Sequence, residues 1–183
     1  MFRSCVLLPA LICTACLIFG CTACTPDIGQ PLDLNQFSGK WYLVAGTPIN
    51  ESLSRCGQFF VRKRSLNTFD IKYTAQSHKN NIPITFNVEG IVRGNKIIGI
   101  WQLQGSRNKL GPFRHVIVLA DYGAFVAMLV CSESTAPRHQ GYKFSMIWSR
   151  ERSLPPSTLK ELKSKLGAYI NQGEIRMVDH GYC

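Results

Sequence analysis

Cysteine and histidine are the side chains of this sequence with the widest chemical scope. Four of the eight cysteines precede residue 24, and the later four are Cys24, Cys56, Cys131 and Cys183. The later four lack the Cys-x-x-Cys spacing of a zinc site, so we expect no bound metal. The four histidines have no serine, aspartate or cysteine placed beside them as in a hydrolase: His78, His115, His139 and His180. We therefore expect neither an enzyme nor a protein with a cofactor.

The N-terminus has the pattern of a secretory signal peptide. Arg3 precedes an apolar run over 6–20, and Cys21-Thr22-Ala23 ends on a small residue. We expect residues 1–23 to be removed and residues 24–183 to form one extracellular domain. The run Ile18–Cys21 also resembles a bacterial lipoprotein box, which would acylate Cys21, although Phe19 fits that pattern poorly. No later stretch is long and apolar enough for a transmembrane segment.

The four cysteines that remain after cleavage are even in number and widely spaced. In a secreted chain this predicts two disulfides, with every pairing open on composition alone. The net charge of +10 is compatible with nucleic acid, an anionic membrane or an acidic ligand as partner, or with none. No basic-aromatic module is present, so we do not expect nucleic acid binding.

The sequence pattern in the middle of the chain predicts an all-β fold. Apolar and β-branched runs alternate with turn residues, and they predict strands at 40–48, 56–66, 68–77, 83–93, 96–104, 113–121, 124–133 and 142–150. Short links suggest an eight-stranded antiparallel up-and-down β-barrel, because closure removes exposed edges. One C-terminal α-helix follows Pro155 and Pro156, and its apolar spacing predicts that it packs outside the barrel: Leu159, Leu162, Leu166, Tyr169 and Ile170.

Three short segments should meet at one end of such a barrel. They are Gly39-x-Trp41 at the start of the first strand, Asp121-Tyr122 at the sixth turn, and Arg150 after the last strand. A guanidinium can stack over an indole face, and a buried pair of this kind would close that end.

This constellation resembles the lipocalin family, whose motifs are G-x-W, T-D-Y and a late arginine. Ala120 stands where the family has threonine. The chain is most similar to the branch that contains apolipoprotein D and the insect bilin-binding lipocalins. That resemblance implies the disulfides Cys24–Cys131 and Cys56–Cys183, and a barrel that binds a small hydrophobic molecule.

The resemblance also fixes which side chains point inward. Counting back from Arg150 places Trp148, Met146 and Phe144 inside. The other strands contribute Phe59, Val61, Phe69, Ile71, Tyr73, Ile97, Gly99, Trp101 and Leu103. All of these residues except Gly99 and Trp148 are predicted to line the ligand cavity, and the alternative is that each aromatic is packed core. Packed core is the favoured interpretation for Trp41 and Trp148, near the closed end.

Basic residues gather in the loops expected at the open end. The acidic residues of these loops are Glu51 and Glu133. The basic residues are Arg55, Lys79, Arg107, Lys109, Arg114 and Arg138, with His78 and His139 beside them. We hypothesise that the ligand carries a carboxylate held at this mouth, above all by Arg107, Lys109 and Arg114. The alternative is a set of solvated loop charges.

The sequence therefore predicts a secreted carrier or scavenger of a small hydrophobic ligand of the bilin, fatty acid, retinoid or carotenoid class. The alternative is a lipocalin that acts through its surface, binding a protein partner or assembling as a homo-oligomer. Ile98 and Ile100 on the outward side of the fifth strand could serve such a contact, and the alternative is that they lie under the C-terminal helix or tail. The sequon at Asn50 predicts glycosylation in a eukaryotic host.

Overall fold

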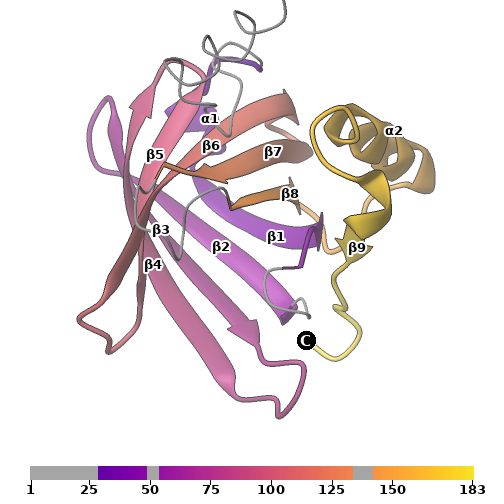
Figure 1. Cartoon of the computed structure of the whole chain (residues 1–183), viewed down its shortest axis with the longest axis horizontal. Helices are drawn as coiled ribbons and strands as arrows, with labels where there is room; N and C mark the ends of the chain where they lie inside the picture. The colour runs from indigo at the N-terminus through magenta and orange to yellow at the C-terminus, as the bar shows by residue number, and fades with distance from the viewer. Residues whose placement is uncertain (1–28, 49–53, 134–141) are drawn as a thin grey trace, which may run out of the picture.

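The computed structural model describes residues 29–48, 54–133 and 142–183 and shows a β-barrel (Figure 1). Its strands are β1 (Gly39–Gly46), β2 (Arg55–Lys63), β3 (Thr68–Gln76), β4 (Pro83–Arg93), β5 (Lys96–Leu103), β6 (Lys109–Asp121), β7 (Phe125–Ser132), β8 (Lys143–Ser149) and the short β9 (Arg176–Met177). The helices are α1 (Leu34–Phe37), α2 (Pro156–Leu166) and the 3₁₀ turn η2 (Gln172–Glu174). All eight predicted barrel strands are present.

The barrel closes because β1 pairs with strands from both ends of the meander. Consecutive strands pair antiparallel from β2 to β8, and β1 pairs with β8 on one side and with β2 on the other. The pairing of β1 with β2 covers only the first half of β1, from Gly39 opposite Val61 to Tyr42 opposite Gln58. Beyond that point β9 pairs with Ala45 and Gly46. The predicted eight-stranded up-and-down barrel is thereby confirmed.

Alternation of apolar and polar residues explains the inner and outer faces. Along β3, Phe69, Ile71 and Tyr73 are buried, whereas the intervening Asp70 and Lys72 are not. Successive side chains of a strand point to opposite faces, so one face of each strand enters the barrel core. Interior side chains from β1 to β8 form one continuous hydrophobic cluster.

The helix α2 packs outside the barrel, as predicted. Its fully buried Leu162 and Leu166 lie in a second cluster with outward side chains of β1, β7 and β8. The helix ends at Leu166, so Tyr169 and Ile170 lie in the turn that follows it. None of the helices in the described ranges is long and apolar enough to cross a bilayer.

Three local features differ from the sequence-based expectation. Strand β6 begins at Lys109 rather than 113, and Gly111 and Pro112 lie inside it near a shift in its register with β5. The short α1 and β9 were not predicted, because each is too brief to leave a periodic pattern. α1 is fixed by Asp33, whose carboxylate accepts hydrogen bonds from the backbone of Asn35 and Gln36.

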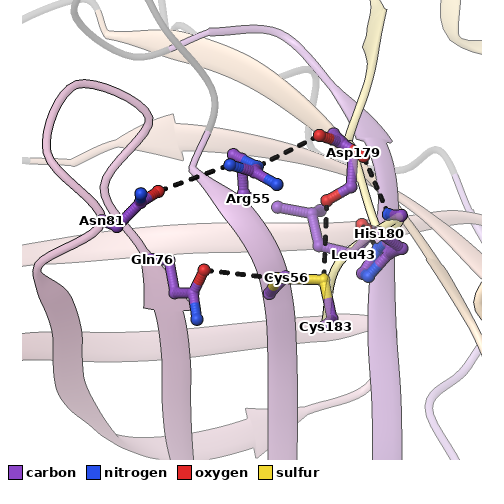
Figure 2. The surroundings of a disulfide bond; sticks show 9 residues. Leu43, Arg55, Cys56, Gln76, Asn81, Asp179, His180 and Cys183 are labelled. Carbon is purple, nitrogen blue, oxygen red and sulfur yellow. Dashed lines mark hydrogen bonds and ion pairs between the residues drawn. A yellow bond between two sulfur atoms is a disulfide. The ribbon is translucent and has the colours of Figure 1, made fainter.

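The disulfide between Cys56 and Cys183 is present, and it joins the start of β2 to the C-terminus (Figure 2). Cys131, at the end of β7, is buried. Its predicted partner Cys24 lies outside the described residues, so that pairing stays a prediction. The predicted signal peptide, Asn50, Glu51, Arg138 and His139 also lie outside them.

Candidate ligand-binding site

One end of the barrel is sealed by the motif residues. The Arg150 guanidinium carbon lies 3.6 Å from the centre of the Trp41 ring. Its nitrogens donate to the backbone carbonyls of Gln36, Ser38, Lys40 and Tyr122 at 2.6–3.2 Å. The fully buried Trp41 donates its indole N–H to the carbonyl of Phe37 at 2.7 Å. A ligand therefore has no route through this end, which we call the closed end.

Gly39 is required at the closed end on two counts. Its backbone has φ of 102°, which side-chain-bearing residues rarely adopt. An ideal Cβ there would lie 3.3 Å from a guanidinium nitrogen of Arg150. The glycine of the G-x-W motif thus makes room for the arginine of the third motif.

A cavity of about 270 Å³ lies toward the opposite end, which we call the mouth. Its wall is mostly apolar and comes from six strands and the two segments beside them: Leu43, Gly46, Thr47, Ser54, Phe59, Tyr73, Phe86, Trp101, Phe144, Ser145 and Met146. Most of these residues lie on the inward face of a strand, at the half nearer the mouth.

The aromatic rings on the wall of this cavity contact one another in series, and Trp148 continues the series into the buried core. Neighbouring centroids are 3.8–5.8 Å apart along the series Trp148, Phe59, Tyr73, Phe86, Trp101 and Phe144. These spacings are those of offset-stacked and edge-to-face aromatic pairs. We refer to these six residues as the aromatic girdle, and it offers a flat, polarisable surface to a bound molecule.

The polar side-chain groups on the cavity wall are hydroxyls and the buried Trp101 indole N–H, which has no hydrogen-bond partner among the described residues, rather than charges. Tyr73 and Ser54 lie on one side of the cavity, and burial raises the pKa of the Tyr73 phenol to about 12. On the other side, the hydroxyls of Thr47 and Ser145 lie 2.9 Å apart. A hydroxyl has one donor and two acceptor positions, so each pair keeps capacity to bond a ligand.

One titratable side chain lies deeper in the barrel. His115 of β6 is buried beside Trp101, with ring centroids 5.6 Å apart. Burial lowers the pKa of the imidazole to about 4, so His115 is neutral at physiological pH. Its Nδ1 lies 3.4 Å from the carbonyl of Ile97. No cluster of three or more His, Cys, Asp or Glu side chains is placed to hold a metal within the described part of the chain.

The structure separates the predicted cavity residues into three groups. Phe59, Tyr73, Trp101, Phe144 and Met146 line the cavity. Deeper in the buried core lie Val61, Phe69, Ile71 and Ile97. At the rim of the mouth, Leu103 is 55% exposed.

Sequence reasoning did not name several wall residues. Phe86 pairs with Tyr73 across β3 and β4, so the alternation that placed Tyr73 inside would have found it. Thr47, Ser54 and Ser145 carried no such signal, because small hydroxyl residues at strand ends are equally common on the surface.

Most described basic residues of the predicted mouth already have acidic partners. Arg55 pairs with Asp179 at 3.0 Å, and Lys109 pairs with Glu89 at 3.2 Å. Arg114 pairs with Glu133. Lys79 and Arg107 are exposed in the β3–β4 and β5–β6 loops, as is His78.

Comparison with known proteins identifies the fold. No protein-family model and no curated protein matches the sequence. Among solved structures, the amine-binding protein of Rhodnius prolixus in its tryptamine complex matches with a TM-score of 0.68 and 13% identity, over 84% of each chain. Insecticyanin from the tobacco hornworm Manduca sexta matches with a TM-score of 0.66 and 14% identity, over 87% of each chain. This is the lipocalin fold.

A third lipocalin neighbour is lobster apocrustacyanin A1, with a TM-score of 0.62 and 17% identity, over 86% of this chain and 94% of that one. At such identities the likeness shows the fold alone. The lipocalin architecture that the three motifs predicted is confirmed, with its sealed end and its cavity toward the mouth.

Proposed function

We propose that this protein is a secreted, non-catalytic carrier or scavenger of a small, mostly apolar molecule. The observation that carries the proposal is the aromatic girdle around the cavity. Ligand sites are typically concave and apolar, with a few placed polar groups, and this cavity has that composition. The Rhodnius protein of the same fold is known in complex with tryptamine, a flat molecule with one polar end, which supports a ligand of similar shape here.

The size of the cavity favours a compact ligand. Its volume of about 270 Å³ is near the lower limit of the range of about 300–1,000 Å³ that small-molecule sites span. A fatty acid or a retinoid suits that space better than a four-ring bilin. The hydroxyl pairs favour a ligand with a hydroxyl, carbonyl or amine group.

The hypothesis of a carboxylate at the mouth now depends mainly on Lys79 and Arg107. Arg55, Lys109 and Arg114 are each neutralised by an acidic partner. A binding comparison between a fatty acid and its methyl ester, at low and high salt, tests the hypothesis. Stronger binding of the acid at low salt supports it, and equal affinity without salt dependence contradicts it.

Two measurements test the carrier function. The first is the absorption spectrum of the natively purified protein, with mass spectrometry of its organic extract. The second is a tryptophan-fluorescence titration with retinol, palmitate and 2-naphthol. We expect Trp101→Ala to weaken binding about tenfold or more, because it removes one side of the cavity wall. The matched control is Phe60→Ala, which removes an outward, 44% exposed ring of β2. An empty extract together with no saturable binding, or equal loss in both variants, would overturn the proposal.

Secretion has its own test. Protein expressed in eukaryotic cells should reach the medium with Cys24 at its N-terminus, and glycosidase treatment should lower its apparent mass through Asn50. Retention inside the cell, or a lipid on Cys21, would contradict this part of the proposal.

A further inference from the structure

The rim of the barrel mouth carries exposed apolar side chains. Ile82 is 57% exposed in the β3–β4 loop, and Leu103 and Leu110 are 55% and 45% exposed where β5 ends and β6 begins. We call these three residues the apolar lip. Figure 1 shows the two hairpins that carry them at the end of the barrel away from α1. Both belong to the wall formed by β3 to β6.

The three lip residues lie on two neighbouring hairpins of the rim, Ile82 on the β3–β4 hairpin and Leu103 and Leu110 on the β5–β6 hairpin. Leu103 pairs with Phe86, and Leu110 pairs with Trp101, so each leucine is in register with a ring of the aromatic girdle. The N–H of Gln104 donates to the carbonyl of Thr85 at 2.8 Å, which ties the end of β5 to the start of β4. The apolar lip thus extends the apolar cavity wall to the surface.

Positively charged side chains flank the apolar lip. Lys79 lies in the loop that carries Ile82, and Arg107 lies between Leu103 and Leu110. Both are exposed, and neither forms an ion pair with any described residue. The described acidic side chains at this end are paired instead: Glu89 with Lys109, Glu133 with Arg114, and Asp179 with Arg55.

We infer that the mouth docks on an anionic lipid bilayer, with the apolar lip inserted at the headgroup level and Lys79 and Arg107 against the lipid charge. Apolar side chains beside lysine and arginine are the combination that binds a membrane interface. The net charge of +10 attracts the molecule to such a surface from a distance. This inference goes beyond the proposed carrier function. It explains how a poorly soluble ligand enters the cavity, because the docked mouth opens directly into the bilayer.

The test is cosedimentation of the ligand-free protein with vesicles of phosphatidylcholine alone or with about 30% phosphatidylserine, an anionic lipid that gives the vesicle a negative surface potential. We expect binding only to the anionic vesicles. Lys79→Gln with Arg107→Gln should weaken it about tenfold, and Ile82→Ser with Leu110→Ser by a similar factor.

Matched controls lie at the closed end of the barrel. Leu66 is 83% exposed in the β2–β3 turn, and Arg93 and Lys96 flank the β4–β5 turn. Leu66→Ser, and Arg93→Gln with Lys96→Gln, should leave vesicle binding unchanged. Equal losses in the mouth and closed-end charge variants would mean that net charge alone attracts the protein. Absence of binding to anionic vesicles would also overturn the inference, as would lip variants that bind like wild type.

The vesicle assay contains no ligand, and the fluorescence titration contains no lipid. Failure of membrane docking is therefore distinguishable from failure of the carrier function. Wild-type protein that does not bind anionic vesicles counts against the inference, whatever else the apolar lip contacts.

Discussion

At the scale of single residues, the side chain of Arg150 holds the segments of the closed end together. Its guanidinium stacks on Trp41 and bonds four backbone carbonyls, so one side chain joins α1, β1, the β6–β7 turn and the end of β8. Arg150→Met should lower the free energy of unfolding by about 3 kcal/mol, because the stack and several hydrogen bonds to a charged group are lost. Urea denaturation measures this loss. Arg152→Met is the matched control, and a similar loss in both variants would contradict the assignment.

Tyr73 provides the sharpest test of polar recognition in the cavity. Tyr73→Phe keeps the ring in the aromatic girdle and removes its hydroxyl from the cavity wall. We expect it to weaken binding of 2-naphthol about threefold to tenfold, the effect of one net hydrogen bond, and to leave naphthalene unaffected. Fluorescence titration of both probes measures the difference. Equal effects on the two probes would show that the hydroxyl does not contact the ligand.

His115 should make the stability of the protein depend on pH. Its native pKa of about 4 is lower than the unfolded value of about 6.5, so the unfolded state takes up the proton first as the pH falls. The free energy of unfolding should therefore drop by about 3 kcal/mol from this group between pH 7 and pH 4. His115→Gln should have a shallower pH dependence over that interval. Parallel curves for variant and wild type would contradict the burial of a neutral imidazole.

At the scale of elements, strand alternation and turn residues predict the barrel well. Each strand leaves a periodic apolar signal, and the three motifs place its closed end. The ion pairs of the mouth could not be predicted from the sequence. Arg55 meets Asp179 and Lys109 meets Glu89 only because of the register and the path of the C-terminal tail. Charges counted along the chain therefore overstated the positive field at the mouth.

The C-terminal tail replaces β2 as the neighbour of the second half of β1. Val178 donates its backbone N–H to Val44, and His180 donates its Nε2–H to the carbonyl of Leu43. Figure 2 shows the Cys56–Cys183 disulfide and the Arg55–Asp179 ion pair that fasten this tail to β2. Since Leu43 lines the cavity and Val178 is buried in the same interior cluster, the tail continues the barrel wall beside β1.

Removal of this disulfide should loosen the tail without destroying the barrel. The bond closes a loop of 127 residues, so Cys56→Ser with Cys183→Ser should cost up to about 4–5 kcal/mol of stability. We expect faster amide exchange at Val178, faster ligand dissociation and an unchanged far-UV circular dichroism spectrum. Asp179→Asn, which breaks only the ion pair, is the control. Loss of the β spectrum at low temperature would contradict the prediction.

At the scale of the whole molecule, the two ends of the barrel have opposite characters. The closed end is filled by stacked side chains and by the hydrogen bonds of Arg150, and the mouth end combines a cavity, an apolar lip and cations that have no ion-pair partner among the described residues. The fold alone specifies neither a ligand nor a surface, since unrelated functions share one architecture. The case for a carrier therefore depends on the side chains that line the cavity.

The most direct test of that case is a two-dimensional NMR titration of the ¹⁵N-labelled protein with 2-naphthol, retinol and palmitate. We expect saturable shifts, for at least one probe, of the Trp101 indole and of the amides of Tyr73, Phe86 and Phe144. The indole of Trp41, bonded to Phe37 at the closed end, should shift little. Saturable shifts confined to the outer wall, for example at Lys72 and Asn87, or none with any probe, would contradict a ligand site inside the barrel.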